Sequence, residues 1–84
     1  MPQVVVVPVK RGSKKYEALR KLIEVSRSNS RMTWRGMLDV LIRMGISSSY
    51  AEKVVRELIA LGVVRKVDNT SYEVDAKALE EALK

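Results

Sequence analysis

The stretch from Met44 to Val64 constrains the fold more than any other part of this sequence. A turn at Gly45 is followed by three serines that can cap a helix. The next apolar residues recur at helical spacing and predict one buried face: Ala51, Val54, Val55, Leu58 and Leu61. Ser47 and Ser49 are alternative caps, and Ser49 could form a capping box with Glu52. Gly62 suits a left-handed helix end. We therefore expect a helix that passes directly into a strand.

The segments on either side of this stretch predict further helices and a hairpin. Ser13 can cap a helix over 14–28, and Thr33 can cap a second over 34–44. The inner face of that second helix is expected to carry Met37, Leu38, Leu41 and Ile42. Short strands are expected at 31–32, 63–67 and 71–74, with a hairpin tip at 68–70, and Asp75 can cap a last helix over 76–83. The predicted fold class is α+β.

The N-terminal segment is a β-branched run, which predicts a strand over residues 3–10. Pro8 cannot donate a ladder hydrogen bond, so an edge position or a bent end is expected. We divide the chain into an N-terminal strand and basic arm (1–12), a central domain (13–74) and a C-terminal helix (75–84). The first and last of these are apolar additions, which makes them candidates for a homodimer contact.

Composition narrows the classes of function that the chain can have. A length of 84 residues is expected to form one domain, with a formal net charge of +6. Fourteen of the sixteen basic residues but only five of the ten acidic residues precede position 68, so the body of the chain should attract polyanions. Cysteine and histidine are absent, which excludes disulfides and nearly every zinc site, and we expect no cofactor.

Two weaker expectations concern the setting of the protein. No apolar run approaches the length of a membrane span, and no signal peptide is recognisable, so we expect a cytoplasmic protein without membrane contact. Amides are scarce and charged residues are plentiful, which is typical of proteins from hot environments.

From Ser13 to Val74 the chain resembles the winged-helix family of DNA-binding domains, in the small prokaryotic or archaeal form. The resemblance is carried by the order of elements and by two short patterns. The first is Met44-Gly45-Ile46-Ser47, and the second is Leu58-Ile59-Ala60-Leu61-Gly62-Val63-Val64. It implies a helix-turn-helix with a β-hairpin wing that binds double-stranded DNA and regulates transcription or coats DNA.

The resemblance also implies which residues meet the nucleic acid. The early exposed residues of the third helix would face the bases, namely Ser48, Ser49, Tyr50 and Lys53, with Arg56 one turn further. Phosphate contacts are expected from Arg65, Lys66 and Asn69 in the wing, from Arg31 and Arg35 beside the second helix, and from Lys10, Arg11, Lys14 and Lys15 in the arm. The alternative explanation is that the serines at 47–49 only cap the helix and that the arm is a solvated linker without phosphate contacts. Trp34 and Tyr72 are expected to be packing residues.

Two carboxylates on the third helix are unfavourable for DNA binding. Glu52 and Glu57 would repel phosphate, although Glu52 can pair with Arg56 four residues on. They leave open a protein–protein adaptor in a replication or transcription complex, and an RNA-binding winged helix is a further alternative. No phosphate-binding loop, nucleophile motif or clustered carboxylates are present, so we expect no catalytic activity.

Overall fold

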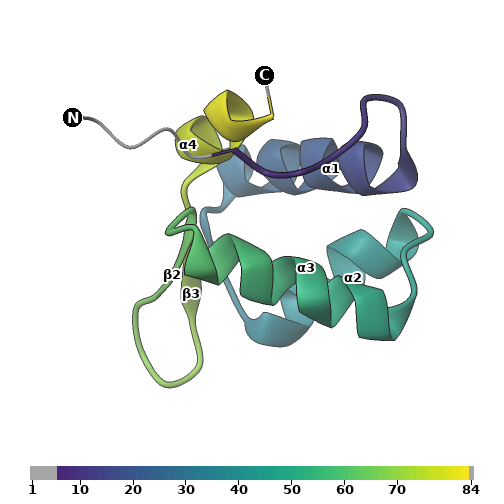
Figure 1. The fold of residues 1–84 in the computed structure, drawn as a ribbon. Helices are drawn as coiled ribbons and strands as arrows, with labels where there is room; N and C mark the ends of the chain where they lie inside the picture. The colour runs from purple at the N-terminus through teal and green to yellow at the C-terminus, as the bar shows by residue number, and fades with distance from the viewer. Residues whose placement is uncertain (1–5, 84) are drawn as a thin grey trace.

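Four helices and a three-stranded antiparallel sheet form the part of the chain that this computed structural model describes, residues 6–83 (Figure 1). The elements follow in the order α1 (Lys14–Ser28), β1 (Arg31–Met32), α2 (Trp34–Arg43), α3 (Ser48–Ala60), β2 (Val64–Lys66), β3 (Tyr72–Val74) and α4 (Ala76–Ala82). The predicted α+β class is confirmed. The helix boundaries match the expected ones to within a residue, and the two hairpin strands are shorter than expected.

Each helix begins at a side chain that accepts a backbone N–H from its own first turn. Ser13, Thr33 and Asp75 cap α1, α2 and α4, as predicted. For α3 the cap is Ser47, whose hydroxyl accepts the N–H of Tyr50. Of the two caps that the sequence allowed, the structure therefore uses Ser47, which leaves the hydroxyls of Ser48 and Ser49 outside the capping role.

Two glycines set the direction of the chain around α3. Gly45, between α2 and α3, has a φ of +94°, and Gly62, after α3, has a φ of +81°. Both values lie in the left-handed region that side chains with a Cβ disfavour. The turn at Gly45 is followed by the buried Ile46, and the turn at Gly62 leads from α3 into β2.

The sheet has the order β1-β3-β2, so β3 is its central strand. Arg31 on β1 and Arg65 on β2 both lie opposite Glu73 of β3. Met32 and Lys66 both lie opposite Tyr72 in the next row. Directly opposed residues share a face of the sheet, and neighbours along a strand take opposite faces. Arg65 and Lys66 therefore point to different sides of the hairpin.

The core is built from one face of each helix and from the start of the hairpin. The fully buried large side chains include Leu19, Leu22, Ile23, Met37, Leu41, Val55, Leu58, Val63, Val64, Val74 and Leu79. Most of the predicted inner faces are confirmed. Leu61, expected on the buried face of α3, is half-buried. Ile42 is 36% exposed, because it lies at the edge of the stripe formed by Met37, Leu38 and Leu41.

The two terminal segments belong to this same core. The α4 helix packs on α1, and Leu79, Ala82 and Leu83 are buried. Val7 is also buried, and its N–H donates to the carbonyl of Ala82 over 3.2 Å. The predicted N-terminal strand is wrong for residues 6–10, which form no strand and cover helices, while positions 3–5 lie outside the described residues. Pro8 removes one of the donors that a strand here would need. The homodimer stays a prediction.

Candidate nucleic-acid interface

The outward side of α3 carries a polar stripe that the described part of the chain leaves uncovered. Ser49, Lys53 and Arg56 are all exposed and follow one another at helical spacing, opposite the buried stripe that contains Val54 and Val55. Within residues 6–83, the side chain of Lys53 makes no hydrogen bond or ion pair. Ser48 and Tyr50 flank the stripe and are exposed as well. This side of α3 therefore presents hydroxyl donors and cations to solvent.

An ion pair between α1 and α3 gives one carboxylate of α3 a partner within the protein. The Nζ of Lys15 lies 3.0 Å from Oε1 of Glu57 and 2.9 Å from the carbonyl oxygen of Pro8. The two charged side chains are only 13% and 33% exposed. Lys15 is therefore held inside the protein and does not join the free cations of the arm. Glu57, in turn, is neutralised and no longer opposes an anion at α3. The partners are 42 residues apart, so no local pattern in the sequence signals the pair.

The guanidinium of Arg56 lies over an aromatic ring, and within residues 6–83 it does not form the pair with Glu52 that their spacing allows. Its guanidinium carbon lies over the ring of Trp34, 5.9 Å from the centroid. Trp34 in turn packs against Tyr72, with ring centroids 6.0 Å apart and planes tilted by 50°. The row Arg56–Trp34–Tyr72 connects α3, the start of α2 and the central strand β3. The prediction that the two aromatic residues are packing residues fits this arrangement, but their contact with Arg56 was not anticipated.

The hairpin that follows α3 has one neutralised and one free basic residue. Arg65 pairs with Glu73 across the strands at 3.3 Å, as their register requires. Lys66 is exposed and has no such partner among the described residues. Asn69 is exposed at the tip. Of the three residues predicted to contact phosphate from the wing, Lys66 and Asn69 have no side-chain partner within residues 6–83. Arg65 would have to leave Glu73 to contact a ligand.

Asp68 organises the hairpin tip. Its carboxylate accepts the N–H of Thr70 at 2.9 Å, the N–H of Ser71 at 2.8 Å and the hydroxyl of Thr70 at 3.2 Å. These bonds, led by that from the backbone of Thr70, lower the pKa of Asp68. Asp68 therefore stabilises the hairpin tip, and backbone N–H donors partly compensate its negative charge.

The basic arm lies against the opposite end of α3. Together with the turn before α3 it encloses an open groove of about 420 Å³, lined by Pro8, Val9, Lys10, Ser13, Lys14, Lys15, Gly45, Ile46, Ser47 and Tyr50. In Figure 1 the purple arm runs from beside α4 across α1 to a loop, and this loop and the turn between α2 and α3 lie on the side of the molecule away from the hairpin. Lys10, Arg11 and Lys14 are exposed. Free cations are therefore present at both ends of α3.

Two further arginines, Arg35 on α2 and Arg31 on β1, are both exposed. Arg35 follows Trp34 in the first turn of α2, and Arg31 lies at the edge of the sheet opposite Glu73. The Arg56–Trp34 contact places the start of α2 beside α3. Arg35 thus belongs to the same region as the α3 stripe, whereas Arg31 belongs with Arg65 to the outer face of the sheet.

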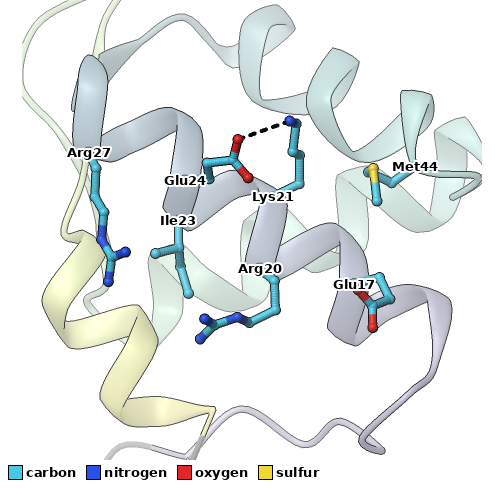
Figure 2. Close-up of a pocket in the computed structure, with 7 residues that line it drawn as sticks. All are labelled: Glu17, Arg20, Lys21, Ile23, Glu24, Arg27 and Met44. Carbon is cyan, nitrogen blue, oxygen red and sulfur yellow. Dashed lines mark hydrogen bonds and ion pairs between the residues drawn. The ribbon is translucent and has the colours of Figure 1, made fainter.

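A second hollow, on the outer face of α1, has a different character. It measures about 270 Å³ and is lined by Glu17, Arg20, Lys21, Ile23, Glu24, Arg27 and Met44 (Figure 2). Acidic and basic side chains alternate around it, and Lys21 pairs with Glu24. A surface of mixed sign gives no strong field for an anion. Among residues 6–83 no cluster of acidic side chains could hold a metal ion, and no helix is long and apolar enough to cross a membrane.

Comparison with protein-family models, curated proteins and solved structures found no match to this chain. The function of the α3 surface must therefore be inferred from its own geometry and charge. Three features bear on that inference: an uncovered helix face, free cations at both of its ends, and internal pairing of Glu57.

Proposed function

We propose that this protein is a winged helix that binds double-stranded DNA, with α3 in the major groove. The β2–β3 hairpin would serve as the wing on the sugar–phosphate backbone, and the basic arm would hold phosphates at the other end of α3. The observation that carries the proposal is the uncovered stripe of Ser49, Lys53 and Arg56, with the exposed cations of the arm at one end and Lys66 of the hairpin at the other. A regulator of transcription or a chromatin-type protein is the biological role we favour.

The dimensions of the surface support this proposal. A helix of 13 residues is about 20 Å long and about 10–12 Å across with its side chains, which matches the width of the major groove. The hairpin follows α3 after Gly62 and so stands beside the groove that α3 would occupy. The arm would then meet the backbone near the N-terminal end of the helix.

The pairing of acidic residues supports it as well. Glu57, one of the two carboxylates that oppose DNA binding, is neutralised by Lys15. The remaining one, Glu52, has no ion pair within residues 6–83. It is the one specific observation that favours an adaptor whose partner is a basic protein surface, which is our second candidate.

Salt dependence of binding to a random-sequence duplex tests the proposal. Contact with about five phosphates predicts a slope of about −4.5 for log affinity against log salt. Between 50 and 200 mM salt the affinity would then fall about 500-fold. Fluorescence anisotropy on a labelled duplex measures both quantities. No binding at 50 mM salt, or a flat slope, would favour the adaptor, and preference for structured RNA would favour an RNA-binding role.

Single charge deletions sharpen that test. Lys66→Ala removes a free hairpin cation and should make the slope shallower by about 1. Arg20→Ala removes the same charge from the outer face of α1 and should leave the slope unchanged (Figure 2). Equal effects of the two substitutions would mean that only overall charge matters and that the assigned face is wrong. The solution mass of the free and bound protein tests the homodimer.

A further inference from the structure

The structure assigns Arg56 as a guanine-reading residue whose guanidinium is positioned by Trp34. This inference rests on the proposed DNA binding and adds to it a preferred base and a positioning residue on another helix. Its basis is the contact between Arg56 and the ring of Trp34, 5.9 Å from guanidinium carbon to centroid. That distance is within the range at which an aromatic face attracts a cation.

The contact leaves the hydrogen-bonding capacity of Arg56 intact. A ring face attracts the cation as a whole and uses no acceptor atom, so the five N–H donors stay available. Within residues 6–83, Arg56 makes no side-chain hydrogen bond or ion pair. An arginine fork with free donors matches the O6 and N7 acceptors of guanine in the major groove. Lys53, one turn earlier on the stripe, has neither the fork nor a ring beside it.

The ring itself is fixed from its other side. Trp34 is half-buried and packs against Tyr72, which lies on the central strand of the sheet. Arg56 is otherwise an exposed, flexible side chain that would lose rotamer freedom on binding a base. Holding it against a fixed ring reduces that loss before the ligand arrives. Trp34 is thus a positioning residue, and Tyr72 supports it.

The first part of the test uses the protein without DNA. Protons on the Arg56 side chain should show upfield ring-current shifts in NMR spectra, and Trp34→Leu should abolish them. Trp34→Phe keeps a ring at this position and should keep part of the shift. Arg56 protons at ordinary positions in the unaltered protein would overturn the inference without reference to DNA.

The second part of the test measures base preference by selection from a random duplex library. One position of the selected site should require guanine. Arg56→Ala should reduce that preference by about 5- to 150-fold, the range for a bidentate arginine–guanine pair. Trp34→Leu should reduce it about two- to fivefold at that position alone, the range for an exposed cation–π contact. Trp34→Phe should restore most of it. A purely structural defect would instead weaken all positions together.

The outcomes separate this inference from the proposed function. Salt-dependent duplex binding with a guanine preference that survives Arg56→Ala, or with no base preference at all, would overturn the inference and leave DNA binding standing. Absence of duplex binding would overturn both the proposed function and the inference about Arg56. Arg20→Ala serves as the control, because it removes a cation from the outer face of α1, away from the α3 stripe and Trp34. It should leave the guanine position unchanged.

Discussion

The ion pair between Lys15 and Glu57 should contribute more to stability than an ordinary surface pair. Exposed pairs contribute about 0.2–1 kcal/mol, and breaking a fully buried pair costs about 3–5 kcal/mol. At 13% and 33% exposure the Lys15–Glu57 pair lies between these limits, and we expect a coupling of about 1–1.5 kcal/mol. Lys15→Met should cost about 2 kcal/mol in total, because it also removes the donor to the Pro8 carbonyl and leaves Glu57 unpaired.

A double-mutant cycle measures this coupling. Lys15→Met, Glu57→Gln and the double variant would be unfolded in urea, and the coupling is the part of the double change that the single changes do not explain. The exposed pair Lys21–Glu24, 3.2 Å apart on α1, is the matched control and should show about 0.2–0.5 kcal/mol. A coupling for Lys15–Glu57 no larger than that of the control would refute the reasoning.

The same variants distinguish two roles for Lys15 in DNA binding. If Lys15 only neutralises Glu57, Lys15→Met should weaken binding by exposing that carboxylate, and adding Glu57→Gln should restore the affinity. If Lys15 contacts phosphate directly, as the arm sequence first indicated, Glu57→Gln should not restore it. Anisotropy titrations at one low salt concentration separate these outcomes.

Three local predictions follow from caps and turns. Ser47→Ala should cost about 1 kcal/mol in urea unfolding because Ser47 caps α3, whereas Ser49→Ala should change stability little. Gly62→Ala should cost about 1 kcal/mol because its φ is +81°, even though its surroundings leave room for a methyl group. The pKa of Asp68 is lowered in the folded protein, so its stabilisation of the hairpin is fully present above the pKa of the unfolded state. That stabilisation is lost as the pH falls through the folded-state pKa. Amide hydrogen exchange at Thr70 in acid measures the loss.

Elements set by local signals were predictable from the sequence. The caps at Ser13, Thr33 and Asp75 and the glycine after α3 each act within a few residues of themselves, and the structure uses all four. The short strand β1 was also expected. Local hydrogen-bonding chemistry decides these features, so reading along the chain is sufficient to find them.

Features that depend on distant partners were not predictable in this way. The β-branched composition of the N-terminal segment predicted a strand, but Val7 packs against α4 instead, because burial against helices satisfies the same apolar side chain. Lys15 was expected to contact phosphate, and Arg56 to contact bases or to pair with Glu52; the nucleic-acid contacts stay predictions. Their partners within the chain, Glu57 and Trp34, lie on other helices and become neighbours only once α1, α2 and α3 have packed together.

Each ion pair uses one acidic and one basic residue, so pairing leaves the net charge unchanged but decides which side chains keep an uncompensated charge. Glu57, Glu73 and Glu80 pair with Lys15, Arg65 and Arg27, while Lys53, Arg56 and Lys66 remain without acidic partners among the described residues. Within residues 6–83, Glu52 is the one acidic residue of α3 whose carboxylate has no ion pair. Two like charges about 4 Å apart in water repel by about 1 kcal/mol, so Glu52→Gln should raise DNA affinity about two- to fivefold at low salt. A lower affinity, or no change, would mean that Glu52 does not face phosphate and would strengthen the case for a protein partner on this side of α3.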